Sequence, residues 1–130
     1  MQGQSIQVFG DGESVRDYVH VDDVVDAHSR VVDPLHSDPC SVFNIGTGVG
    51  TTPLKLIRLL MNAIGAEFTS ATCVEHLSAR GGEADSSILS SAKARRQLKW
   101  NPSFDLHSGI ESVIDSLPNT ETCRAESTPV

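Results

Sequence analysis

Residues 10–27 read GDGESVRDYVHVDDVVDA and contain the signals that decide how the chain begins to fold. Before them, polar and apolar residues alternate over 5–9, which predicts a short strand. The glycines at 10–12 supply the turn that ends this strand. The run at 18–21 is typical of a second strand. The stretch therefore predicts two short strands separated by a tight turn.

A helix is predicted directly after the second strand. Asp22 or Asp23 is a suitable N-cap, and the helical pattern continues to about Val32. Asp26 and Arg30 are four residues apart and can form an ion pair on the helix surface. The valines predicted to share one face of this helix are Val24, Val25, Val31 and Val32.

The middle of the chain predicts a third strand over 41–45, which runs into a glycine-rich segment at 46–50. A second helix follows, with Thr52 as N-cap, Pro53 at its first position and Gly65 as its left-handed stop. This helix carries a broad apolar stripe that must be covered, formed by Leu54, Ile57, Leu60, Met61 and Ile64.

The last part of the chain predicts one strand and two helices. The strand covers 68–74, where small and β-branched residues are frequent. Ser90 or Ser91 caps a helix that ends at Trp100, and Asp105 caps the final helix. The order of elements is β-β-α-β-α-β-α-α, which indicates an α/β fold without internal repeats.

Composition limits the function classes. A chain of 130 residues is long enough for one domain, which we expect to occupy 1–118, with a disordered tail over 119–130. Its 10 basic and 17 acidic residues give a net charge of −7, which argues against nucleic acid as a partner. No apolar run is long enough for a membrane span, and the first residues carry no signal-peptide pattern, so we expect a cytoplasmic protein.

Metal binding has little support in the sequence. The three cysteines are far apart, and the five histidines show none of the spacings typical of zinc ligands. We therefore expect no metal site, and we interpret the cysteines as reduced residues without a functional role. His20 is interpreted as lining the end of a strand. The basic residues Lys93, Arg95, Arg96 and Lys99 are interpreted as a solvated helix face, because no aromatic residues are interleaved with them.

Two further features have a functional and a structural interpretation. A strand, a glycine-rich turn and a helix could cradle the phosphates of a dinucleotide, but G-x-G-x-G at 46–50 departs from G-x-G-x-x-G and favours a plain tight turn. Arg16 and Arg80 lie in loops beside glycines, where an arginine can bind phosphate. Considered alone, each is more typical of a surface arginine paired with an acid.

The stretch at 10–27 closely resembles a signature of the extended short-chain dehydrogenase/reductase superfamily. Its R-D-Y-x-H-V form is most similar to the NAD-dependent nucleotide-sugar epimerases of the UDP-glucose (galactose) 4-epimerase type. Three further motifs match in the same order: F-N-I-G-T-G at 43–48, R-x-G-E at 80–83, and the segment 92–102 before the final helix.

The resemblance implies roles for five residues. Arg16 and Arg80 would bind the diphosphate of a UDP-sugar, because two cations match its two anionic groups. Glu83 would accept hydrogen bonds from ribose hydroxyls. Gln7 and Phe9, on the first strand, match the stretch that lies along the uracil. The glycine-rich segment at 46–50 lies away from the dinucleotide loop in that family, which supports the plain-turn interpretation.

The departures from the family are equally informative. The N-terminal glycine loop that binds NAD is absent, and so is the catalytic Tyr-x-x-x-Lys pair; Tyr18 is the only tyrosine, and Asp22 stands four residues after it. The resemblance therefore implies the C-terminal, substrate-binding part of such an enzyme without its Rossmann half. We expect no catalytic residue and no NAD binding in this chain alone, and the missing half as its partner.

Alternatives to an epimerase part remain open. The chain can be a stand-alone, non-catalytic nucleotide-sugar-binding module, or part of a sugar-nucleotide dehydratase, since these enzymes share the G-D-G-x-x-x-R-D motif and the later arginine. It can also be a poorly folded remnant that exposes its apolar helix stripes.

Overall fold

The computed structural model describes residues 5–32, 41–66, 68 and 74–117. Within them the fold is α/β, as predicted. The elements are β1 (Ile6–Phe9), β2 (Val15–Asp17), α1 (Val21–Val31), β3 (Gly50–Thr51), α2 (Pro53–Ala63), β4 (Val74–Leu77), β5 (Ser86–Ser87), α4 (Ala92–Gln97) and α5 (Leu106–Ser116). The predicted tail over 119–130 lies outside the described residues.

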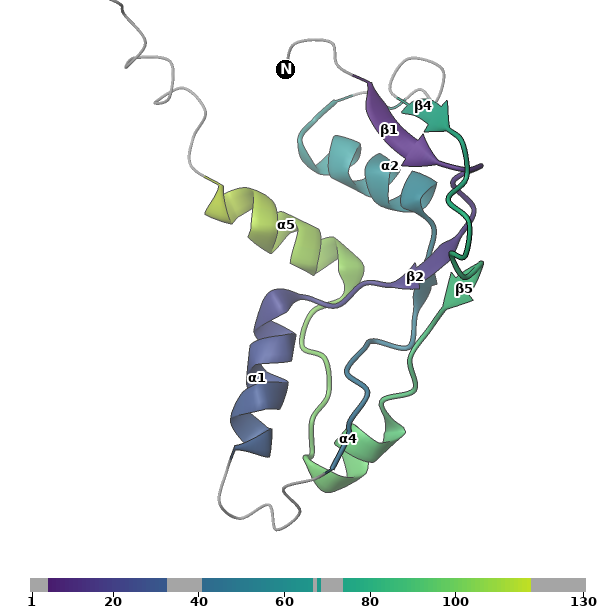
Figure 1. Ribbon diagram of the computed structural model, residues 1–130. Coiled ribbons are helices and arrows are strands. Elements are labelled where there is room, and N and C mark those ends of the chain that lie inside the picture. The colour runs from purple at the N-terminus through teal and green to yellow at the C-terminus, as the bar shows by residue number, and fades with distance from the viewer. Residues whose placement is uncertain (1–4, 33–40, 67, 69–73, 118–130) are drawn as a thin grey trace, which may run out of the picture.

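Two small sheets organise the described part of the chain. β1 pairs in parallel with β4, so that Phe9 lies opposite Leu77. β2 is the middle strand of the second sheet, with β3 antiparallel on one side and β5 parallel on the other. Figure 1 shows α2 beside β1 and β4, whereas α1 and α4 lie at the opposite end of the molecule. The chain segment that leads from β1 to β2 joins the two sheets.

The helices α2 and α5 begin as their capping residues predict. The Thr52 side chain accepts a hydrogen bond from the Lys55 N–H, and Pro53 occupies the first position of α2. Gly65, just beyond the end of α2, has φ +69°, a left-handed conformation that favours glycine. Asp105 and Ser108 form a reciprocal capping box at the start of α5. Both predicted helix starts are confirmed.

The region after the first glycine turn differs from the prediction. The second strand is Val15–Asp17 rather than 18–21, and α1 begins immediately after His20. The N-cap is His20, whose Nδ1 accepts the N–H of Asp22, and neither predicted aspartate caps the helix. The sequence at 18–21 is strand-like, but none of the strands in the described residues pairs with it. Asp23 is a buried residue of α1, and its carboxylate accepts hydrogen bonds from Ser103 and Phe104.

The predicted strand at 41–45 is also wrong, because this segment belongs to neither sheet. Its apolar side chains are used for packing instead, with Phe43 and Ile45 against the buried core. A two-residue strand, β3, forms only at the end of the glycine-rich segment, at Gly50–Thr51. Of the strand predicted over 68–74, residues 69–73 lie outside the described residues, and β4 occupies Val74–Leu77.

The helix α4 is shorter than predicted and ends at Gln97 rather than at Trp100. Ser91 occupies the N-cap position, as predicted, but its side chain makes no capping hydrogen bond; its hydroxyl donates to the Gly46 carbonyl and accepts from the Gly46 N–H. The helix stops because Lys99 turns into the left-handed region, with φ 54°. This turn directs Trp100 into the core, where its side chain is fully buried.

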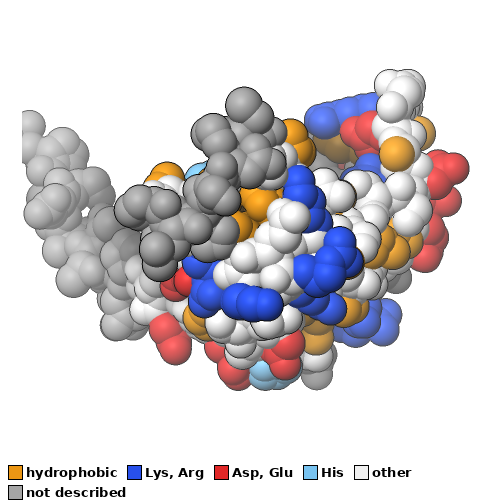
Figure 2. Space-filling view, turned by 90° about the horizontal axis from the view of Figure 1, so that it is seen from below, with side chains coloured by type: hydrophobic (Ala, Val, Ile, Leu, Met, Phe, Trp, Pro, Cys, Tyr) orange, Lys and Arg blue, Asp and Glu red, His pale blue; other side chains and the backbone are white. Residues whose placement is uncertain are grey.

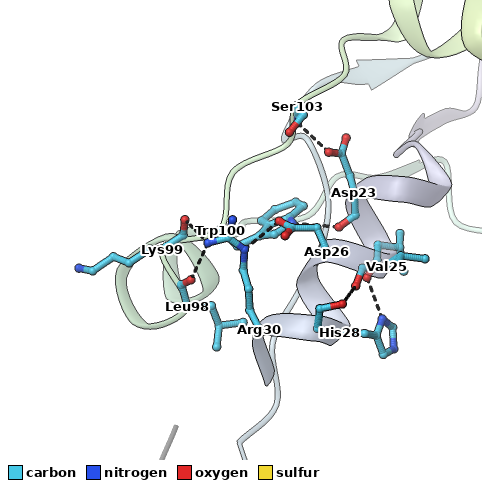
Figure 3. A network of polar contacts seen from close by, with 11 residues as sticks. Asp23, Val25, Asp26, His28, Arg30, Leu98, Lys99, Trp100 and Ser103 are labelled. Carbon is cyan, nitrogen blue, oxygen red and sulfur yellow. Dashed lines mark hydrogen bonds and ion pairs between the residues drawn. The ribbon is translucent and has the colours of Figure 1, made fainter. Parts of the chain in front are cut away.

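Trp100 packs against α1 in a buried cluster of the described residues. Trp100 clusters with the buried residues Ala27, Ala94 and Leu98. Its indole N–H donates to the Asp23 carbonyl at 2.9 Å, and the Asp23 carboxylate accepts the Ser103 N–H at 2.7 Å (Figure 3). The same carboxylate accepts the Phe104 N–H at 3.2 Å. Because the Asp23 carboxylate is buried, these donors compensate for its lost hydration.

The arginine of the predicted Asp26–Arg30 pair extends this network. Its Nε donates to the Asp26 carboxylate at 2.8 Å, and its Nη1 donates to the carbonyls of Leu98 and Lys99 (Figure 3). Arg30 therefore links α1 to the carbonyls that follow α4. The valine face predicted for α1 is not buried: Val25 and Val32 are exposed, and the helix instead buries Asp23 and Ala27.

No helix of the described residues is long and apolar enough to cross a membrane.

Replacement of Asp23 by Ala should lower the free energy of unfolding by about 1–3 kcal/mol, because the part-buried N–H groups of Ser103 and Phe104 lose a charged acceptor. Urea denaturation followed by tryptophan fluorescence measures the change. Asp22→Ala is the matched control, since this neighbouring carboxylate is exposed and removal should cost about 1 kcal/mol or less. Equal losses in the two variants would contradict the role given to Asp23.

Candidate ligand site

The β1–β4 pair brings together two of the predicted site residues. Phe9 ends β1 opposite the end of β4, so the segment after β4 passes beside its ring. The guanidinium carbon of Arg80 lies 3.6 Å from the centroid of that ring. Such stacking fixes the plane of the guanidinium while leaving its N–H groups free for an anion. Gln7 shares the exposed face of β1 with Phe9, and its amide donates to Glu75 at 3.3 Å.

The second sheet positions Arg16 and Glu83. Arg16 lies in β2 opposite Ser87 of β5, and its Nη1 donates to the Val15 carbonyl at 2.9 Å. The chain that leads into β5 carries Glu83. One carboxylate oxygen of Glu83 lies 3.8 Å from Arg16 Nη2, and the other lies 3.9 Å from Arg80 Nη1. Glu83 thus connects the two predicted phosphate-binding arginines.

A cavity of about 240 Å³ opens beside these residues. It contains predicted residues of both kinds, the aromatic Phe9 and the charged Arg80 and Glu83, while Gln7 and Arg16 are not part of its wall. The whole lining consists of Phe9, Gly10, Asp11, Glu13, Ser14, Ala79, Arg80, Glu83, Ala84 and Asp85. An aromatic ring, a stacked guanidinium and several carboxylates suit a ligand that has a planar ring, anionic groups and hydroxyls.

The glycine-rich segment at 46–50 does bind an anion, but the anion belongs to the protein. The Asp17 carboxylate accepts the Thr47 N–H and hydroxyl at 2.9 and 2.6 Å, the Gly48 N–H at 2.9 Å and the Leu89 N–H at 3.2 Å. A Cβ added to Gly46 would come within 2.6 Å of the same carboxylate. These amides are therefore not available as a cradle for the pyrophosphate of NAD, and the plain-turn interpretation is supported.

This arrangement changes the acidity of Asp17. Burial alone would raise the pKa of its carboxyl, but the hydrogen bonds from the Thr47 side chain and from the backbone of Gly48, Thr47 and Leu89 outweigh that effect. The pKa of Asp17 consequently lies below its ordinary value of 3.8. The ionised form is the one that fits the structure.

The other residues considered from the sequence serve structural purposes in the described part of the chain. No group of three or more His, Cys, Asp or Glu side chains is placed there to hold a metal. Figure 2 shows Lys and Arg side chains gathered on the face where α4 lies. Lys93 is not simply solvated, because its ammonium donates to the Val42 carbonyl at 3.0 Å and lies 4.7 Å from the Phe43 ring centroid.

A second, apolar groove of about 310 Å³ lies between α2 and α5. His20 borders it, with its ring stacked on Phe104 at a centroid distance of 4.0 Å, rather than ending a strand as predicted. Tyr18 also contributes to the wall. The apolar side chains that the helices present to the groove are Leu56, Leu60, Leu106, Ile110 and Val113.

Sequence reasoning missed the role of Asp17. The acid follows Arg16 in the R-D pair, and the glycines that receive its carboxylate are 30 residues further along the chain. Sequence spacing alone does not connect an acid with a glycine turn at that distance. One signal was available. If the 46–50 segment is a plain turn and not a ligand loop, its N–H groups need another acceptor within the protein.

Sequence similarity relates the chain to known enzymes. Residues 1–46 match the family described as NAD dependent epimerase/dehydratase. A UDP-glucose 4-epimerase of Rhizobium leguminosarum bv. trifolii is 39% identical over 119 residues, covering 86% of this chain and 35% of that enzyme. The corresponding enzyme of Mycolicibacterium smegmatis is 36% identical over 92% of this chain and 36% of its own length. The chain belongs to the NAD-dependent epimerase/dehydratase family.

Solved structures of the epimerase/dehydratase family agree in fold. The UDP-glucose 4-epimerase of Thermotoga maritima, solved with UDP-glucose, superimposes with a TM-score of 0.76 at 39% identity, over 88% of this chain and 35% of that one. A UDP-glucuronic acid 4-epimerase of Bacillus cereus gives a TM-score of 0.78 at 24% identity, which supports the fold alone. The chain spans about a third of the length of the relatives it matches.

The lowered pKa of Asp17 predicts a specific loss of stability in acid. A depressed pKa means that the carboxylate stabilises the fold above pH 3.8, and that this contribution disappears as the pH falls below that value. The urea midpoint of the parent chain should therefore drop as the pH falls below 3.8. Asp17→Asn should be less stable at neutral pH and show a shallower drop. Parallel pH profiles for the two proteins would refute the assignment.

Proposed function

We propose that this chain is the C-terminal, substrate-binding part of a nucleotide-sugar epimerase of the UDP-glucose 4-epimerase type. In this proposal it contributes binding of a UDP-sugar, while NAD and the residues for hydride transfer belong to the Rossmann part of the enzyme. The proposal extends the family membership to a role for this third of the protein.

The observation that carries the proposal is the pair of arginines joined through Glu83. Arg16 is fixed by the Val15 carbonyl and Arg80 by the Phe9 ring, so both cations are held before a ligand arrives. Two fixed guanidinium groups suit the two anionic groups of a diphosphate. The Phe9 ring would lie along the uracil together with Gln7, and Glu83 would accept hydrogen bonds from the ribose hydroxyls.

The apolar groove supports the Rossmann part as the partner. Of the stripe predicted on α2, only Ile57 is fully buried, while Leu60 and Met61 are half-buried and Ile64 is exposed. On the facing helix α5, Val113 is 46% exposed. A groove with this apolar lining is favourable to cover with another protein surface. The matched relatives have roughly two thirds of their length beyond the region aligned here, which is enough for such a surface.

Replacement of Arg16 or of Arg80 by Ala should each weaken UDP binding about fivefold or more. Charge-assisted hydrogen bonds contribute about 1.5–3 kcal/mol, reduced here because both side chains are partly exposed. Isothermal titration calorimetry of the full chain measures the dissociation constants. Arg96→Ala, on the exposed side of α4, removes the same charge away from the cavity and should leave binding unchanged. Unchanged affinity in both site variants would argue against the proposal.

The chain alone should not convert UDP-galactose to UDP-glucose, even with NAD added. The sequence carries no Tyr-x-x-x-Lys pair, and the amides of Thr47 and Gly48 are already bonded to Asp17. Chromatography of the nucleotide sugars after prolonged incubation provides the measurement, with a complete UDP-glucose 4-epimerase as positive control. Detectable turnover would place catalytic residues in this chain and overturn the proposed division of roles.

A further inference from the structure

Glu83 holds the position that a ligand anion would take. Its two carboxylate oxygens point to different arginines, one to Arg16 at 3.8 Å and one to Arg80 at 3.9 Å. The two guanidinium groups are anchored independently of Glu83, through the Val15 carbonyl and the Phe9 ring. The Glu83 carboxylate, on an exposed side chain, therefore lies between two cations that each have another anchor.

The charges around the cavity oppose a bare anion. Asp11, Glu13 and Asp85 line it together with Glu83, whereas Arg80 is the one cation in its wall within the described residues. An anion that approaches the arginines must displace the Glu83 carboxylate into this negative surrounding. A ligand that carries hydroxyl donors can bond that carboxylate in its new position, which compensates for the lost ion pairs. Inorganic pyrophosphate offers no sugar hydroxyls for this purpose.

We propose that Glu83 is a specificity-determining residue that discriminates against bare phosphate anions in favour of ligands whose hydroxyl groups hydrogen-bond to its displaced carboxylate. This inference rests on the proposed function, because it assigns the arginines to a diphosphate. It adds that Glu83 competes with the diphosphate before binding and contacts the sugar afterwards. The site thus selects a nucleotide over its diphosphate portion.

The test compares two probes that share a diphosphate, UDP and inorganic pyrophosphate, by calorimetric titration of the full chain at fixed ionic strength. In Glu83→Gln, which keeps the shape of the side chain, pyrophosphate should bind at least threefold more tightly. UDP should bind equally or more weakly, so the ratio of the two affinities shifts at least threefold toward pyrophosphate. Circular dichroism verifies that the variant is folded.

Glu13→Gln is the matched control, because it removes one negative charge from the same cavity wall without an ion pair to either arginine among the described residues. Its pyrophosphate affinity should change less than twofold. An unchanged pyrophosphate affinity in Glu83→Gln, or an equal gain in Glu13→Gln, would overturn the role of Glu83. Absence of UDP binding by the parent chain would contradict the proposed function instead, and the pyrophosphate comparison alone then decides on Glu83.

Discussion

The Asp17 carboxylate is the constraint on which the arrangement of the second sheet depends. It accepts hydrogen bonds from Thr47, Gly48 and Leu89, and thereby joins β2 to two segments that lie 30 and 72 residues further along the chain. Strands of two or three residues supply few backbone hydrogen bonds of their own. A single charged acceptor shared by four donors therefore stabilises what the short strands cannot, and it fixes the backbone beside Arg16.

The candidate site lies where the two sheets are connected. β4 ends at Leu77 and β5 begins at Ser86, so the segment between them crosses from one sheet to the other. Both of its ends are fixed by backbone hydrogen bonds, from the Gly10 N–H to the Leu77 carbonyl and from the Val15 N–H to the Asp85 carbonyl. The connecting segment carries the cation and the carboxylate of the site. Its conformation, and hence the spacing of the charges, follows from the pairing of both sheets.

Local signals predicted what local interactions determine. Thr52 and Asp105 cap their helices as expected, because a capping side chain bonds N–H groups only two or three residues away. The predicted strand at 18–21 failed because a strand requires a partner, and partner choice is not encoded within a short window. Sequence spacing likewise could not predict the contact between Phe9 and Arg80, because a parallel pair of distant strands creates it. The resemblance to a family, rather than periodicity, selected these site residues.

The helices are buried to different extents, and this also depends on contacts between distant segments of the chain. α1 packs tightly because Trp100 and Asp23 give it both apolar and polar contacts on one side. α2 and α5 contact each other, yet the groove between them stays open and apolar, with Val113 exposed. A helix stripe is retained as apolar when something covers it, since exposed patches of this kind favour association. The charged candidate site and the apolar groove thus lie in different parts of the fold: the charges gather beside the sheets, and the open apolar surface lies between α2 and α5.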